Sequence, residues 1–417
     1  MRLMKKTKKS IIYCIFLLLF VQFNSSLAIV NLGINMLENS NFAEIKGKRI
    51  ALLTNFSGRD NTGKLTTEIL ALSKEVELKL ILTPEHGFYG VKAAGESVSN
   101  SEYWGIPILS LYGSTKLIPS NYADDFDIII VDIQDIGVRA YTFISTLYYV
   151  MQSAVNLDKE IYILDRPNPL GGIIVDGNLL EEDYKSFIGI VPVTYLHGLT
   201  IGEIASMIIG EGWLGKNAKE NACKLSIIKM DGWERWMQWE DTGLMWIPTS
   251  PNIPSVDAIR GAAMLGWIGE LSLFSVGIGT NLPFQYFGTP DINSNFYSIL
   301  DNFELNGSQI IQTDFMPVYG KYANQHCKGF LLRFEKNNNF TPFSNGIELI
   351  ITLRNLYPKL FIEKNIELSK KQMFKKATGT SKLYDLIFEG GSDDSIRKAA
   401  YNGVMDFFKL RKKYLLY

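Results

Sequence analysis

The sequence VELKLILTPEHGFYG, residues 76–90, decides the fold of this chain. Its first seven residues are rich in leucine, isoleucine and valine, as in a strand buried on both faces of a parallel sheet. The run stops at Pro84, and Glu85, His86 and Gly87 follow at once. The stretch therefore predicts a buried strand whose carboxyl end carries a carboxylate and an imidazole.

Four further apolar runs repeat this pattern, and segments with helical periodicity such as Tyr141–Asn156 lie between them. These runs are Arg49–Asn55, Ile106–Gly113, Asp127–Ile133 and Glu160–Arg166. Alternating buried strands and helices predict an α/β fold with a parallel sheet. Beyond about Pro283 the chain is rich in glycine and proline, and we expect a smaller α+β domain ending in a helix from about Asp393.

The N-terminus has the pattern of a secretory signal. Five basic residues precede an apolar run at Ile11–Phe23, and Ser26-Leu27-Ala28 offers small residues for cleavage. The apolar run is too short for a typical transmembrane helix, so we expect no membrane span after cleavage. We expect a signal peptide at 1–28, an α/β catalytic domain at 29–283 and the smaller domain at 284–417. The predicted location is the periplasm or the medium; an uncleaved N-terminal anchor is the alternative.

Composition narrows the range of partners and cofactors. The 417-residue chain has a formal net charge of −1, and loss of the five cations in residues 1–28 takes it to −6. A mildly acidic chain is a poor partner for nucleic acid. Only Cys223 and Cys327 remain after cleavage, enough for at most one disulfide. The sequence contains no cysteine–histidine cluster that would indicate a metal site, and we expect no cofactor.

Polar residues collect where the predicted strands end. They include Asn55, Glu85, His86, Tyr112, Asp132, Gln134, Asp135, Asp165, Arg166, Asn168 and His197. Ligands of open α/β sheets bind outside the carboxyl ends of the strands. This coincidence predicts one functional site built from several strand ends.

Glu85 and His86 form the first candidate pair in this site. Neighbouring aromatic residues would desolvate the carboxyl, and desolvation raises a carboxyl pKa into the range of a general acid. The alternative is that Glu85 caps the next helix and that His86 is an ordinary turn residue.

Asp132, Gln134, Asp135 and Arg139 form the second cluster, followed by Tyr141. Two carboxylates beside an arginine fit an ion pair that holds the loop. They equally fit a catalytic carboxylate beside an arginine that meets an anionic substrate, because guanidinium forks match carboxylates.

Rigid polar loops supply the remaining candidates. Prolines make both Asp165–Gly172 and Thr249–Ser255 rigid, and two glycines in the first let backbone approach a ligand. His197 and Glu270 complete the set. Glu203 lies three residues after Thr200, which predicts a helix capping box rather than a catalyst.

Two phosphate-binding patterns fail on inspection. Residues 210–217, GEGWLGKN, have phosphate-loop spacing, but Asn217 replaces the Ser or Thr that holds magnesium. The stretch GIGTNL, residues 277–282, lacks the third glycine of a dinucleotide fingerprint. No GxSxG or HExxH motif is present.

Eight ordered motifs resemble the exo-β-N-acetylmuramidase (NamZ) family, many members of which were long described only as a domain of unknown function. They are LTPEHGFYG, LYG, VDIQDIGVRAYTF, LDRPNPLGG, HGLTIGEIA, GW, PTSPNIPS and the terminal RKKYLLY. The resemblance runs from about Lys46 to Tyr417. It implies a Rossmann-like N-terminal domain, a smaller C-terminal domain and a cleft between them.

The resemblance also implies an activity and its site. Family members are glycoside hydrolases that release N-acetylmuramic acid from the non-reducing end of peptidoglycan fragments such as MurNAc-GlcNAc. The Glu of the PEHG motif falls on Glu85, the leading catalytic candidate. The cleft motifs carry over to Asp132, Asp135, Arg139, Asp165, Arg166, Asn168, His197 and Asn252. One loop departs from the pattern, with Ile278 and Gln285 where many members have Arg and Glu.

The resulting hypothesis is a two-carboxylate mechanism. Glu85 is the acid, oriented by His86 or His197, and Asp132 or Asp135 is the second carboxylate. Arg139 or Arg166 pairs with the lactyl carboxylate of the substrate. The acetamido oxygen of the substrate is an alternative nucleophile. Two other classes stay open, a wall-fragment amidase or esterase and a muropeptide-binding protein without catalysis. The sequence does not indicate an oligomeric state.

Overall fold

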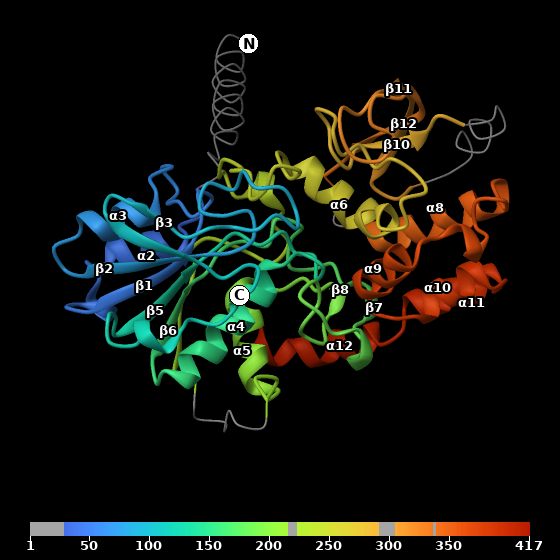
Figure 1. The fold of residues 1–417 in the computed structure, drawn as a ribbon. Helices are drawn as coiled ribbons and strands as arrows, with labels where there is room; N and C mark the ends of the chain where they lie inside the picture. The colour runs from blue at the N-terminus through green and yellow to red at the C-terminus, as the bar shows by residue number, and fades with distance from the viewer. Residues whose placement is uncertain (1–28, 216–222, 292–304, 337–338) are drawn as a thin grey trace, which may run out of the picture.

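The computed structural model describes residues 29–215, 223–291, 305–336 and 339–417 (Figure 1). A seven-stranded sheet forms its N-terminal part, in the order β3-β4-β2-β1-β5-β6-β9. The strands are β1 (Arg49–Thr54), β2 (Glu77–Thr83), β3 (Ser101–Tyr103), β4 (Ile106–Ser110), β5 (Ile128–Asp132), β6 (Glu160–Leu164) and β9 (Leu225–Ile228). All neighbours pair in parallel except β3 and β4.

Helices cover both faces of this sheet because side chains alternate between its faces along each strand. Ile50 and Leu52 pack in one apolar cluster with α2 (Gly33–Asn39) and α3 (Thr66–Leu72). Ala51 and Leu53 pack in the other with α4 (Phe143–Asn156) and α5 (Ile201–Gly210). The expected parallel α/β fold is confirmed. The short strands β3 and β9 were not predicted.

The C-terminal part combines a small antiparallel sheet with helices. Its sheet has the order β10-β12-β11, with β10 (Tyr286–Thr289), β11 (Ser308–Phe315) and β12 (Cys327–Phe334). The helices are α6 (Val256–Gly269), α8 (Pro342–Leu356), α9 (Leu368–Thr378), α10 (Lys382–Phe388), α11 (Asp393–Ala400) and α12 (Val404–Arg411). All of them except α12 share one apolar core with the small sheet, which confirms the α+β prediction.

The last helices return to the N-terminal part. The single helix expected from Asp393 is two, because the turn at 401–403 ends α11 and Gly403 adopts a left-handed φ of 78° before α12. Phe407 of α12 lies in the apolar cluster of α4 and α5, and Figure 1 shows α12 beside α5. A two-stranded sheet of β7 (Asp176–Leu179) and β8 (Thr194–Leu196) contacts α12 through β7.

Two further sequence predictions can be compared with the structure. The capping box of α5 is present, with Thr200 Oγ1 accepting from the Glu203 backbone N–H and the Glu203 carboxylate accepting from Thr200 N–H. Cys223 and Cys327 are both free. Among the helices that the structure describes, none combines the length and apolar character needed to cross a membrane.

Candidate functional site

The candidate site lies at the carboxyl ends of β1, β2, β4, β5 and β6. The chain moves outward from β1 to β2 and β4, then crosses back to β5 and moves the other way. The point between β1 and β5 is therefore the topological switch point, where open α/β sheets bind ligands. The loops after these strands carry the polar residues singled out from the sequence.

Glu85 is held inside the turn that follows β2. His86 and Gly87 both adopt left-handed φ angles, 73° and 76°, which turn the chain sharply after the carboxylate. Glu85 Oε1 accepts from the Gly95 backbone N–H at 2.9 Å, and Oε2 accepts from Thr142 Oγ1 at 2.7 Å. Only 5% of the residue is exposed. These bonds orient the carboxylate from two different loops, and it caps no helix of its own.

Two tyrosines lie close enough to Glu85 for its charge to raise their pKa values. Burial raises the pKa of Tyr112 to about 12, and the charge of Glu85 adds to the shift. Burial also raises the pKa of Tyr141, and both Asp135 and Glu85 raise it further. The Tyr141 hydroxyl donates to Thr249 Oγ1 at 2.8 Å. Tyr141 thus lies within electrostatic reach of both carboxyl groups.

Asp135 faces His197 across a short gap. Its Oδ2 accepts from Gly137 N–H at 2.7 Å and lies 3.8 Å from His197 Nε2. His197 Nδ1 accepts from Leu199 N–H, so the neutral ring carries its proton on Nε2, toward Asp135. Burial raises the pKa of Asp135 to about 7. Burial and the charges of Arg411 and Arg139 lower the pKa of His197 to about 3.

Asp132 has a different environment, three residues earlier. Arg166 binds it with a fork, Nε to Oδ1 at 2.5 Å and Nη2 to Oδ2 at 2.8 Å. Thr66 Oγ1 donates to the same carboxylate. Asp132 is fully buried and Arg166 is 4% exposed. The pair fits the ion-pair interpretation of the sequence, and Asp132 has little freedom to act on a substrate.

Arg139 is also bound into the scaffold. Nη1 donates to the carbonyls of Asn178 and Val193, and Nη2 to those of Ala377 and Thr378. Its fork is therefore occupied by the protein itself, which joins the N-terminal part to the end of α9. A role in binding a substrate carboxylate finds no support in this geometry.

Three further predicted residues, Asp165, Asn168 and His86, form hydrogen bonds that hold the loops around the site. Asp165 accepts from Thr200 Oγ1, Gly202 N–H and the Tyr417 hydroxyl, and burial raises its pKa to about 6. Asn168 accepts from Leu170 N–H in its own loop and donates to Leu199 O, so it joins this loop to the one before α5. His86 Nδ1 donates to Lys92 O.

Two predicted residues lie toward the C-terminal part. Asn252 Oδ1 accepts from the Tyr319 hydroxyl at 3.1 Å. Glu270 follows the last residue of α6, and burial raises its pKa. Ile278, at the departure from the family pattern, packs against the core of the C-terminal part.

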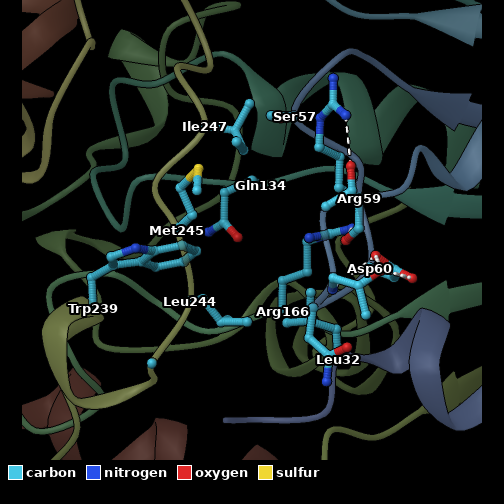
Figure 2. A pocket seen from close by; sticks show the side chains of 14 residues that line it. Leu32, Ser57, Arg59, Asp60, Gln134, Arg166, Trp239, Leu244, Met245 and Ile247 are labelled. Atoms are coloured by element: carbon cyan, nitrogen blue, oxygen red, sulfur yellow. Dashed lines mark hydrogen bonds between the residues drawn. The ribbon is translucent and has the colours of Figure 1, made fainter.

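A pocket of about 210 Å³ opens at the switch point (Figure 2). Figure 2 shows Arg59, Asp60 and Arg166 on one side, and Gln134, Trp239, Leu244 and Met245 on the other. Sequence reasoning missed Arg59, Trp239 and Met245 as site residues, along with Thr142. The position of Arg59 a few residues after β1 was the one available signal.

Metal binding has no support in the part of the chain that the structure describes. No group of three or more His, Cys, Asp or Glu side chains lies close enough there to hold an ion.

Known proteins similar to this chain cover nearly all of it. The family model described as exo-beta-N-acetylmuramidase NamZ, N-terminal, matches residues 50–257, and its C-terminal counterpart matches residues 263–417. The peptidoglycan beta-N-acetylmuramidase NamZ of Bacillus subtilis (strain 168) is 34% identical over 391 residues, covering 93% of this chain and 91% of that protein.

Crystal structures of two DUF1343 family proteins from Bacteroides fragilis NCTC 9343 also match. They are 33% and 30% identical to this chain, with TM-scores of 0.86 and 0.71. Each match covers 93% of this chain and 99% of the other.

Proposed function

The chain belongs to the NamZ family of exo-β-N-acetylmuramidases, and from that premise we propose a specific activity. It is a glycoside hydrolase that removes N-acetylmuramic acid from the non-reducing end of peptidoglycan fragments such as MurNAc-GlcNAc. The activity serves cell-wall turnover or recycling.

The observation that carries this proposal is the pair of buried carboxyl groups at one edge of the sheet. Glu85 follows β2 and Asp135 follows β5, the two strands that flank β1. The charge of each group raises the pKa of Tyr141, which lies within electrostatic reach of both. Glycosidases typically work with two carboxyl groups around one glycosidic bond, and this pair supplies them.

The two carboxyl groups take different roles in the proposed mechanism. Glu85, oriented by Gly95 and Thr142, protonates the leaving oxygen. Asp135 acts as the base that activates water, because a pKa of about 7 suits a base at neutral pH. The Nε2–H of neutral His197 faces Asp135 and favours its ionised form once the substrate has entered. Asp132 drops out of this scheme because Arg166 and Thr66 bind it.

We further propose that the chain is exported and acts in the periplasm or outside the cell. The basic and apolar pattern of residues 1–28 supports this. Those residues lie outside the described part of the structure.

The direct test is to incubate the purified protein with chromogenic β-glycosides of MurNAc and of GlcNAc. Release from the MurNAc glycoside alone is the expected result. Tight binding of MurNAc-GlcNAc without release would instead indicate a binding protein. Cleavage of an acyl bond in a wall fragment, with its glycosidic bond intact, would indicate an amidase or esterase.

A further inference from the structure

The pocket at the switch point is connected to the proposed catalytic groups by two short stretches of chain. Gln134, in its wall, directly precedes Asp135. Ile247, also in its wall, lies two residues before Thr249, and Thr249 Oγ1 accepts a hydrogen bond from the Tyr141 hydroxyl. The pocket therefore borders the two chain segments that carry Asp135 and Thr249.

Gln134 presents an unused acceptor to this pocket. Its Nε2 donates to the carbonyls of Asp135 and Pro167, at 2.8 and 2.9 Å. Those two bonds fix which end of the amide is nitrogen, and therefore the direction of Oε1. Gln134 is 3% exposed, and within the described residues Oε1 has no hydrogen-bond partner. A buried acceptor of this kind is costly unless a ligand supplies a donor.

Arg59 gives the same pocket a positive charge. Its guanidinium lies 4.4 Å from the centre of the Phe56 ring and donates to the carbonyls of Phe56 and Gly63. No ion pair joins it to a carboxylate of the described chain, whereas Arg166 beside it forks onto Asp132. The Asp60 carboxylate is held in its own turn by Thr62 and Lys64. Arg59 is thus the cation with charge available for an incoming anion.

The opposite wall of the pocket is mostly apolar. Trp239, Leu244, Met245 and Ile247 form it, with Met245 80% exposed. The pocket therefore combines an acceptor, a cation and an apolar surface. A fitting ligand carries an N–H donor, a carboxylate and small apolar groups close together.

We propose that this pocket binds the two substituents that set N-acetylmuramic acid apart from an unmodified sugar. The acetamido N–H donates to Gln134 Oε1, and the lactyl carboxylate pairs with Arg59. The acetyl and lactyl methyl groups pack against Trp239 and Leu244. This assignment rests on the proposed function and deepens it, because it makes Arg59, rather than Arg139 or Arg166, the residue that selects the carboxylate.

The test compares two substrates that differ only in that charge. Chromogenic β-MurNAc glycosides with a free lactyl acid and with its methyl ester are assayed with wild type, Arg59→Ala and Arg59→Lys. In wild type, kcat/KM for the acid exceeds that for the ester. Arg59→Ala reduces this ratio by about 10- to 100-fold, mainly through KM, because one charge-assisted contact is lost. Arg59→Lys should retain part of the preference for the acid over the ester, because it keeps the positive charge.

Arg333→Ala is the matched control, since Arg333 is an exposed arginine on β12 outside the pocket. It should leave the acid-to-ester ratio unchanged. An unchanged ratio in Arg59→Ala, or equal losses on both substrates, would overturn the assignment and leave the proposed hydrolase activity intact. Absence of release by wild type from either substrate would instead count against the proposed function itself.

Discussion

The loops after β5 and β6 both hold buried polar groups, but they treat them in opposite ways. After β6, the Asp165 carboxylate receives donors from Thr200, Gly202 and Tyr417. After β5, Gln134 Oε1 and Asp135 Oδ1 have no partner in the described residues, and neither has Nε2 of His197, which lies 3.8 Å from Asp135 Oδ2. The two loops thus differ in how completely their buried polar groups are hydrogen-bonded, although each carries a buried aspartate.

The physical reason is the cost of leaving buried polar groups unpaired. An unpaired group loses its water without replacement, at roughly 1–3 kcal/mol each. The loop after β6 avoids that cost at Asp165. The loop after β5 retains it where a substrate would supply the missing partners. The following predictions test this division.

The largest effect is expected at Glu85. Glu85→Gln keeps the shape and the acceptor of the side chain but removes the transferable proton, so kcat should fall by about 100- to 10,000-fold. The melting temperature should change little. Glu96→Gln, an exposed neighbour in the same loop, serves as control. Near-normal turnover by the Glu85 variant would remove this residue from the mechanism.

Asp132→Asn should damage stability instead. It leaves the Arg166 guanidinium buried without its counter-charge, which typically costs about 3–5 kcal/mol. Urea unfolding monitored by circular dichroism measures the loss. Asp127→Asn breaks the partly exposed pair with Arg49 and should cost much less. Equal losses in the two variants would show that burial does not distinguish them.

Asp135 should set the acidic limb of the activity profile. With a pKa of about 7, it loses its ability to accept a proton as the pH falls through neutrality. We expect kcat/KM to decline below about pH 7, and Asp135→Asn to lower it about 100-fold and abolish that limb. A pH series with both proteins checks this, and a limb that persists in the variant would assign it to another group.

The same carboxyl predicts an effect on stability with a definite sign. Its pKa is raised from 3.8 in the unfolded chain to about 7 in the folded protein. The folded state therefore binds this proton more tightly, and the ionised group costs stability progressively as the pH rises from about 4 to 7. Asp135→Asn should raise the melting temperature relative to wild type more at pH 8 than at pH 4. A difference independent of pH would contradict this.

The smallest effect is expected in the satisfied network. Tyr417→Phe removes the hydroxyl that donates to Asp165 and accepts from Met230 N–H, which should cost about 1 kcal/mol or somewhat more. Turnover of the MurNAc glycoside should be almost unchanged. A large loss of kcat with normal stability would move Asp165 from the scaffold into the site.

Local sequence predicts where the polar residues of the site lie, but not which of them are paired within the protein. The five buried strands and the placing of polar residues at their carboxyl ends follow from apolar runs and from the geometry of parallel sheets. The role of Asp132 does not, because its partners Thr66 and Arg166 lie 66 and 34 residues away. An aspartate at a strand end looks the same whether or not an arginine closes over it.

Arg139 shows the same limit over a longer distance. Its motif suggested an anion-binding residue, but its acceptors include Thr378 O, 239 residues later. Backbone carbonyls carry no signature in the sequence. The apolar wall at Trp239 and Met245 likewise comes from a segment without a recognisable motif, so only the folded chain identifies the pocket.

The return of α12 to the first part of the molecule has a consequence for how the protein is made. Phe407 completes the apolar cluster of α4 and α5, and Tyr417 reaches Asp165 from 252 residues downstream. Ribosomes deliver these pieces after all seven strands of the large sheet, so this apolar cluster stays partly uncovered until they emerge. Contacts of such long sequence separation form slowly. The nascent chain should therefore depend on chaperones until α12 has been made and covers the cluster of α4 and α5.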